Sequence, residues 1–151
     1  MKFTLRAAVA LLLAGSALAQ SPERSYAQYL VDKTLASHPE LTVLALHVTP
    51  PASRDNVIIA SNIGHIGKKA DVDDLSVLES GKPRMEVTRT GDLSVELLMR
   101  DADGKSIGVI GSTFRFPAGG DKSLILHQAE RLRDELGAQT PSLAALFVPA
   151  R

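Results

Sequence analysis

The chain has 151 residues, with 17 lysines and arginines, 17 aspartates and glutamates, and no cysteine. This length suits one domain with a single hydrophobic core, and the lack of cysteine excludes disulfides, thiolate metal sites and cysteine nucleophiles. The balanced formal charge argues against a nucleic-acid-binding protein and against a polybasic protein of membrane surfaces.

The first 19 residues have the three-part pattern of a secretory signal peptide. A short basic start precedes an apolar run at residues 7–14, which is too short to span a bilayer. Small residues, Ala17 and Ala19, then occupy the positions that a signal peptidase recognises. The alternative is a buried N-terminal helix. We expect cleavage after Ala19 and a periplasmic or secreted domain, because no later segment is long enough to cross a membrane.

The segment after this leader predicts a helix that begins near Ser21 and ends near His38. Ser21 suits the N-cap position and Pro22 suits the first helical position. His38 precedes a proline, which disfavours helical backbone. Two strands are expected next, over residues 41–49 and 56–61. The first of them is apolar on both faces, which indicates a central place in its sheet.

The second half of the chain predicts a short helix, three strands, a long helix and an apolar tail. The glycines and the acidic helix starts mark the boundaries of these elements. The expected elements are a helix capped by Asp71 or Asp73 and ended by Gly81, strands over residues 84–90, 93–100 and 106–116, a helix from Asp121 to Gly137, and the tail at residues 141–151.

Two hairpin-like turns indicate that the last three strands run antiparallel. They lie at residues 90–92 and 101–104. Helices precede and follow the strands rather than alternating with them, which favours an α+β fold over a doubly wound sheet. We therefore expect a five-stranded antiparallel sheet with an N-terminal and a C-terminal helix. The alternation of apolar residues in 93–100 predicts that one sheet face packs on the long helices, while the other carries Glu96 and Arg100.

Several passages resemble motifs of extracellular PAS-like sensor domains of the Cache superfamily. They occur in the family's order and lie within residues 22–137. The matching passages are IIASN at residues 58–62, IGK at 66–68 followed by Ala70 and Asp71, SGK at 80–82, and DADGKSIGVIG at 101–111.

This resemblance implies a PAS-like fold whose ligand lies between one sheet face and the segment that links the second and third strands. Receptors of this type normally lie between two membrane helices, whereas here a cleavable leader is expected and no second span follows. We therefore predict a free exported domain. Its parts would be a signal peptide at residues 1–19, a Cache-like domain at 20–140 and an apolar tail at 141–151.

The resemblance places the candidate ligand-binding residues on the loop after the second strand and on strands three to five. Positive charge gathers there at Lys68, Lys69 and Arg84, and would suit a carboxylate or a phosphate. The simpler interpretation is that the lysines are solvated, that Asn62 caps its own turn, and that Glu96 faces solvent. The predicted site residues are Asn62, His65, Lys68, Arg84, Glu86, Glu96 and Arg115.

His47 and His65 are the two histidines nearest this predicted site. In a regular strand, His47 would share a face with Leu41, Val43 and Ala45 as a hydrogen-bonded core or rim residue. His65 would be either an exposed loop residue or a pH-sensitive ligand contact. No histidine spacing indicates a metal site, and no nucleophile motif is present. A single axial histidine could hold haem, without further support; we predict no metal, no cofactor and no catalytic residue.

The sequence therefore predicts an exported binding protein, without catalysis, for a small carboxylate or amino-acid-like ligand. Its partners would be this ligand, a membrane receptor or envelope protein, and a second copy of the chain through the N-terminal helix. The alternative is an interaction module that binds no ligand and docks its apolar tail, residues 143–148, on a membrane protein. A buried histidine with a carboxylate neighbour beside an open cleft would instead favour an enzyme.

Overall fold

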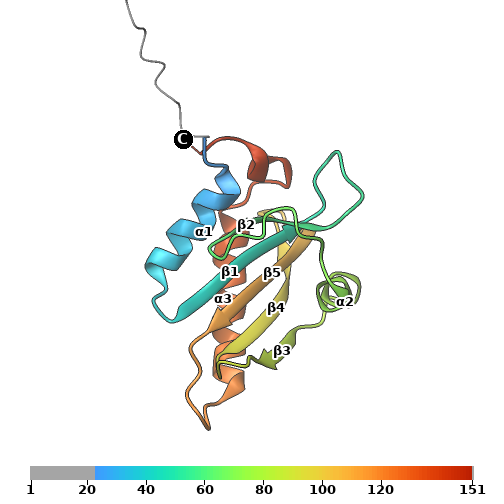
Figure 1. The fold of residues 1–151 in the computed structure, drawn as a ribbon. Coiled ribbons are helices and arrows are strands. Elements are labelled where there is room, and N and C mark those ends of the chain that lie inside the picture. Colours follow the sequence, from blue (N-terminus) through green and yellow to red (C-terminus); the bar gives the residue numbers. More distant parts are fainter. Residues whose placement is uncertain (1–22, 151) are drawn as a thin grey trace, which may run out of the picture.

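The computed structural model describes residues 23–150, so the predicted signal peptide lies outside the described residues. The described part contains α-helices, β-strands and one short 3-10 helix (Figure 1). In chain order they are α1 (Tyr26–Ser37), β1 (Leu41–Val48), β2 (Val57–Ser61), α2 (Val72–Ser80), β3 (Arg84–Val87), β4 (Leu93–Arg100), β5 (Ser106–Phe114), α3 (Lys122–Ala138) and η1 (Ala144–Phe147).

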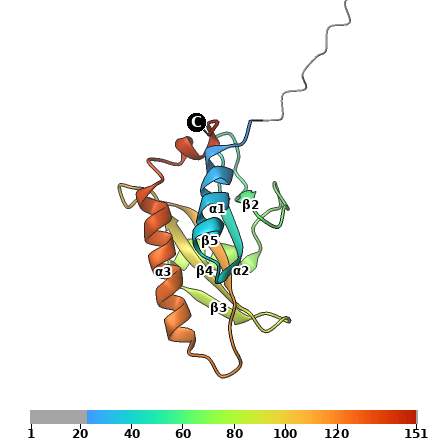
Figure 2. The same ribbon diagram turned by 90° about the vertical axis from the view of Figure 1, so that its left-hand side faces the viewer.

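The strands form one antiparallel sheet of five, in the order β2-β1-β5-β4-β3. Helix α1 packs on β1 and β2, and α3 packs on β4 and β5, on one face of this sheet. Helix α2 lies on the opposite face, where it contacts β4 and β5 (Figures 1 and 2). This is the predicted α+β architecture with an N-terminal and a C-terminal helix, and it is compatible with a PAS-like fold.

The hydrophobic core lies between the sheet and the helices α1 and α3. Strand β4 alternates between buried and half-buried residues up to Met99, as its sequence pattern predicts, and ends on the exposed Arg100. Burial of these side chains is the main stabilising contribution to the fold. The core residues include Leu30 and Val31 of α1, Leu44, Leu46 and Val48 of β1, Leu93, Val95, Leu97 and Met99 of β4, and Ala129, Leu132 and Leu136 of α3.

Helix α1 begins later than predicted. The hydroxyl of Ser25 accepts a hydrogen bond from the backbone N–H of Gln28 at 3.2 Å, so Ser25 is the N-cap. Ser21 and Pro22, on which the predicted start depended, lie outside the described residues, and residues 23 and 24 are not helical. The predicted start was therefore wrong, because a second serine one turn later serves as the cap.

Several strands are one to three residues shorter than predicted. Strand β3 stops at Val87 because the turn that follows is wider than expected, and the Thr88 N–H donates to the Asp92 carbonyl at 2.8 Å. Strand β1 is irregular between Leu41 and Val43. This irregularity places Leu41 in the helix-side core, so the predicted common face of Leu41 and His47 was also wrong.

Gly137 does not end α3 as predicted, since the helix continues to Ala138. The reason for a glycine here is close packing. A Cβ atom at Gly137 would lie 3.1 Å from the carbonyl oxygen of Arg100, so the last turn of α3 can approach the end of β4 closely.

The apolar segment beyond residue 140 packs on the domain. Leu146 of η1 is completely buried in the core. The Tyr26 N–H donates to the Val148 carbonyl, and the Ala150 N–H donates to the Arg24 carbonyl, each at 2.8 Å. Leu146 is therefore already in contact with its own domain. Between residues 23 and 150, no helix combines the length and the apolar character that a membrane span requires.

Candidate functional site

The candidate site lies on the sheet face opposite the core, beside α2. The loop before α2, residues 62–70, is attached to β2 by three backbone hydrogen bonds between residues 56–58 and 67–70, of 2.8 to 2.9 Å. Asp71 then caps α2 by accepting from the N–H groups of Asp73 and Asp74. The loop therefore places the acidic start of α2, with Asp71, Asp73 and Asp74, at the edge of this sheet face.

His47 and Asp74 form a buried pair on this face. The Nδ1 atom of His47 lies 3.3 Å from Oδ2 of Asp74, and the two side chains are only 10% and 9% exposed. The contact is close, but its geometry is too poor for a hydrogen bond, and Nδ1 has no hydrogen-bond partner. Burial alone would raise the pKa of Asp74. The nearby His47, the hydrogen bond from the Asp71 N–H and the positive charge of Lys68 have the larger combined effect, so the pKa of Asp74 is lowered.

Arg84 and Glu96 face each other across the neighbouring strands β3 and β4. Nη1 of Arg84 lies 3.4 Å from Oε1 of Glu96, while Nη2 of Arg84 contacts Asp73 at 2.8 Å and Glu86 at 2.9 Å. The second oxygen of Glu96, Oε2, is buried without a hydrogen-bond partner. Arg84 is thus shared among three carboxylates, which raise its own pKa despite the opposing effect of burial.

Gly111 of the central strand β5 lies between these two pairs. It is in register with Glu96 on one side and with Ala45 on the other. A Cβ atom at Gly111 would meet only Nε2 of His47, at 3.8 Å. Gly111 and Thr113 both remain partly exposed although β5 is in the middle of the sheet. We call His47, Asp74, Arg84 and Glu96 the polar cluster.

The polar cluster perturbs the titration of Glu96. The burial of the Glu96 carboxyl group and the negative charge of Asp74 raise the pKa of Glu96 from 4.5 to about 7, although Arg84 acts in the opposite direction. A carboxyl group with a pKa near 7 exchanges a proton at physiological pH. The cluster can therefore donate or accept a proton, and it can change its charge when a ligand binds.

Glu96→Gln should change how stability depends on pH. The folded domain holds a proton on Glu96 up to about pH 7, whereas the unfolded chain releases it near pH 4.5. Protonated Glu96 therefore contributes to the stability of the folded domain fully below pH 4.5, and this contribution is lost as the pH rises to about 7. The glutamine of the variant does not titrate, so the variant does not lose this stability. Between pH 4.5 and pH 8, the unfolding free energy of the parent should therefore fall by about 2 kcal/mol more than that of the variant.

This difference is measured by urea unfolding of both proteins at pH 4.5, 6 and 8, followed by circular dichroism. The two proteins differ only at residue 96, so the difference between their profiles reports Glu96 together with its effect on Asp74 and Arg84. Parallel pH profiles of the two proteins would contradict the raised pKa.

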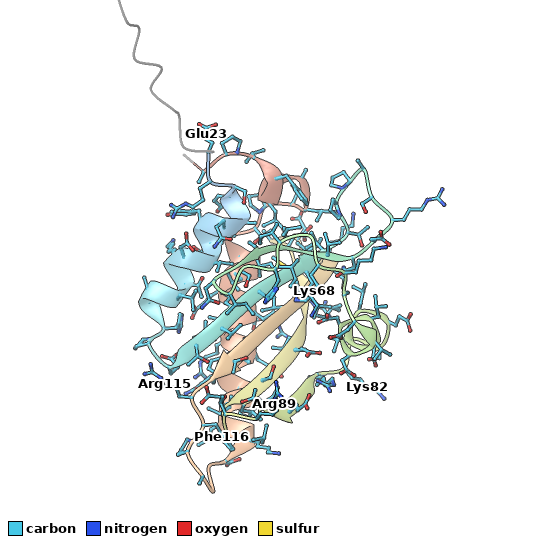
Figure 3. All side chains as sticks on the ribbon, in the orientation of Figure 1. Glu23, Lys68, Lys82, Arg89, Arg115 and Phe116 are labelled. Carbon is cyan, nitrogen blue, oxygen red and sulfur yellow. The ribbon has the colours of Figure 1, made fainter. Side chains whose placement is uncertain are left out.

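The structure brings some of the predicted site residues together and separates the others. Arg84 contacts both Glu86 and Glu96, and Lys68 is close enough to act on Asp74. Arg115 is exposed beyond the end of β5, beside the start of β1, where its N–H donates to the Glu40 carbonyl at 2.9 Å (Figure 3). It is not part of the polar cluster.

Two predicted residues of the loop also have other roles. The side chain of Asn62 accepts from the N–H of Leu44 and donates to the carbonyl of Thr42, both at 3.0 Å. Its amide thus continues the pairing of β2 with β1 and does not cap its own turn. His65 is exposed and adopts a left-handed backbone conformation, with φ of 62°. Neither residue belongs to the polar cluster as the structure places it, so their contact with a ligand stays a prediction.

The predicted excess of positive charge is not present at this face. Arg84 is surrounded by three carboxylates, and Nζ of Lys69 pairs with Asp55 at 2.9 Å, away from the polar cluster. Sequence reasoning missed Asp74, which belongs to the acidic start of α2. Its pairing with His47 depends on the packing of α2 against the sheet, and no local spacing indicates that contact.

Comparisons with known proteins add little to this geometry. No protein-family model matches the chain, and no curated protein is significantly similar to it in sequence. Among solved structures, the repressor BlcR of Agobacterium tumefaciens matches with a TM-score of 0.47 and 13% sequence identity, over 82% of this chain and 68% of that one. A similarity of this size assigns neither a family nor a function.

Proposed function

We propose that this domain binds a small molecule on the sheet face beside α2, through the polar cluster. The strongest support is the incomplete hydrogen bonding of two buried atoms, Nδ1 of His47 and Oε2 of Glu96. Buried polar atoms nearly always have a partner in folded proteins, and an unpaired one is costly. A ligand above the partly exposed Gly111 would lie beside Nε2 of His47, next to this incompletely bonded cluster.

The charges of this face favour an amino-acid-like ligand over a simple carboxylate. Asp74 and Glu96 would attract an ammonium group, and a bound cation would return the pKa of Glu96 toward its usual range. Lys68, whose charge already acts on Asp74, would attract the carboxylate of the same ligand. A zwitterion therefore matches both signs of charge.

We place this binding protein outside the cytoplasm, as a periplasmic or secreted domain. The support is the leader-like pattern of residues 1–19, which lies outside the described residues. The PAS-like motifs in the sequence and the α+β sheet agree with a sensor-like role. The ligand would be captured and released unchanged, and a membrane receptor or envelope protein would be the partner.

Glu96→Gln should weaken binding of such a ligand at least tenfold, because it removes the carboxylate that faces the ammonium group. A thermal-shift screen of amino acids and organic acids first identifies the ligand, and isothermal titration calorimetry then gives Kd for each variant. A ligand present at about 100 times its Kd stabilises the folded domain by about 2.7 kcal/mol, which is a shift of several degrees.

The matched control is Arg115→Ala, which removes an exposed charge distant from the polar cluster and should leave Kd unchanged. Two results would contradict the proposal. One is the absence of any binding by the well-folded protein across the screen. The other is an equal loss of affinity in both variants.

The His47–Asp74 pair favours a second candidate, an enzyme that transfers a proton. The Asp74 carboxylate lies 3.3 Å from Nδ1 of the buried His47, and Glu96, with a pKa of about 7, could act as an acid or base. The same ligand distinguishes the two functions. Recovery of the bound compound unchanged, by nuclear magnetic resonance after prolonged incubation, favours capture; conversion that is lost in His47→Gln favours the enzyme.

A further inference from the structure

A second site lies at the end of the sheet, where the chain leaves β1 and enters β5. There a pocket of about 480 Å³ is bounded by the β1–β2 loop, the end of α2, the β4–β5 turn and the segment before η1. This volume is typical of pockets that hold small molecules. None of its lining residues belongs to the polar cluster. They include Thr49, Asn56, Leu78, Asp101, Ile107 and Leu143.

Asn56 is the unusual residue of this pocket. It is only 8% exposed, yet neither Nδ2 nor Oδ1 of its side chain has a hydrogen-bond partner. Its backbone carbonyl accepts from the Ala70 N–H at 2.9 Å, so the backbone of Asn56 is held while its amide group is not. A buried carboxamide with both ends unpaired is costly for the folded state unless it has a partner from outside the chain.

The other residues of the pocket define what that partner can be. Leu78, Ile107 and Leu143 provide apolar surfaces that would cover a ring. Both carboxylate and ammonium side chains, of Asp101 and Lys105, are also present, so the pocket does not select one sign of charge. The side chain of Asp101 is already engaged by the N–H groups of Asp103 and Lys105, at 3.1 and 2.9 Å. Among the polar residues that line the pocket, the amide of Asn56 is the buried one with no partner within the described part of the chain.

We propose that this pocket binds a small planar molecule with an amide-like edge, that is, a hydrogen-bond donor and acceptor on neighbouring atoms. The carboxamide of Asn56 would pair with that edge through two parallel hydrogen bonds, and the apolar residues would contact the ring. Asparagine reads the edge of adenine in this way. Aromatic carboxamides and nucleobases share the same edge, and both fit this chemistry.

The test uses three probes, nicotinamide, uracil and adenine, which separate the aromatic carboxamide from the two kinds of nucleobase. Each is titrated into the ¹⁵N-labelled domain, and the side-chain amide signals of Asn56 are followed by nuclear magnetic resonance. We expect at least one probe to shift these signals with a Kd below about 1 mM. The absence of any shift with all three probes would overturn the proposal.

Two variants then test the role of the carboxamide. Asn56→Leu has similar volume but no polar atoms, and Asn56→Asp keeps the shape but loses the donor. Both should weaken probe binding at least tenfold, while Asn56→Leu should unfold at the same or a higher temperature than the parent. Arg115→Ala, which changes an exposed residue outside this pocket and outside the polar cluster, is the control and should bind the probe as the parent does.

Unchanged probe binding in both Asn56 variants would overturn the proposal. A lower unfolding temperature of Asn56→Leu together with no probe binding by the parent would also overturn it, because the amide would then bond within the domain through internal water. The Asn56→Asp variant keeps the test decisive even if Asn56→Leu does not fold.

Discussion

Gly108→Ala should destabilise the domain by about 3 kcal/mol or more, enough to leave much of the protein unfolded. A Cβ atom at Gly108 would overlap the carbonyl oxygen of His47 and would lie 2.8 Å from Cγ1 of Val48. The carbonyl belongs to the central pairing of β1 with β5, so it cannot move away without disturbing the register of both strands. Urea unfolding followed by circular dichroism measures this loss.

Gly111→Ala, only three residues further along the same strand, is the matched control. There an added methyl group would meet only Nε2 of His47 at 3.8 Å, an ordinary van der Waals contact. This variant should change stability by less than about 1 kcal/mol. Equal destabilisation by the two substitutions would contradict the close approach to the His47 carbonyl as the cause, because alanine is not a poorer strand residue than glycine.

Leu146→Ala should destabilise the domain by about 3 kcal/mol, within the range for buried leucines. Leu146 is completely buried against the core, whereas Leu143, which also packs on the core, is only partly buried. The substitution removes this contact and leaves a cavity beneath η1. Thermal unfolding followed by circular dichroism should show a decrease of several degrees.

Phe147→Ala tests whether the effect depends on burial. Phe147 is larger than Leu146 and directly follows it, but it is 39% exposed, so its removal should have the smaller effect. A loss of stability in Phe147→Ala that equals or exceeds that in Leu146→Ala would contradict the described packing of the tail. It would also revive the hypothesis that this segment is free to dock on a partner.

Periodicity and turn chemistry predicted most of the fold because they depend on neighbouring residues. The alternation in β4 gave the buried face, and Asp71 with Gly81 marked both ends of α2. The start of α1 was missed because Ser21 and Ser25 are equally good caps by sequence. The irregularity between Leu41 and Val43, which reverses the face of Leu41, depends on pairing with β5 and has no local signal.

The candidate site was only partly predictable for the same reason. Arg84, Glu86 and Glu96 share two paired strands, so their proximity follows from the hairpin. The contact of His47 with Asp74 joins β1 to a helix that is packed on another strand pair. The isolated amide of Asn56 depends on how four distant segments close around it. Such contacts arise from tertiary packing, which local patterns do not encode.

The pairing of the two ends of the described chain determines how the domain would respond to mechanical force. Ser25 and Pro149 form an antiparallel bridge, flanked by the hydrogen bonds of Tyr26 with Val148 and of Ala150 with Arg24. A force that separates these ends would break the hydrogen bonds one after another, which is an unzipping geometry rather than a shear geometry. The central strands would bear little of the tension at first, so stretching would release η1 before it disturbed the sheet.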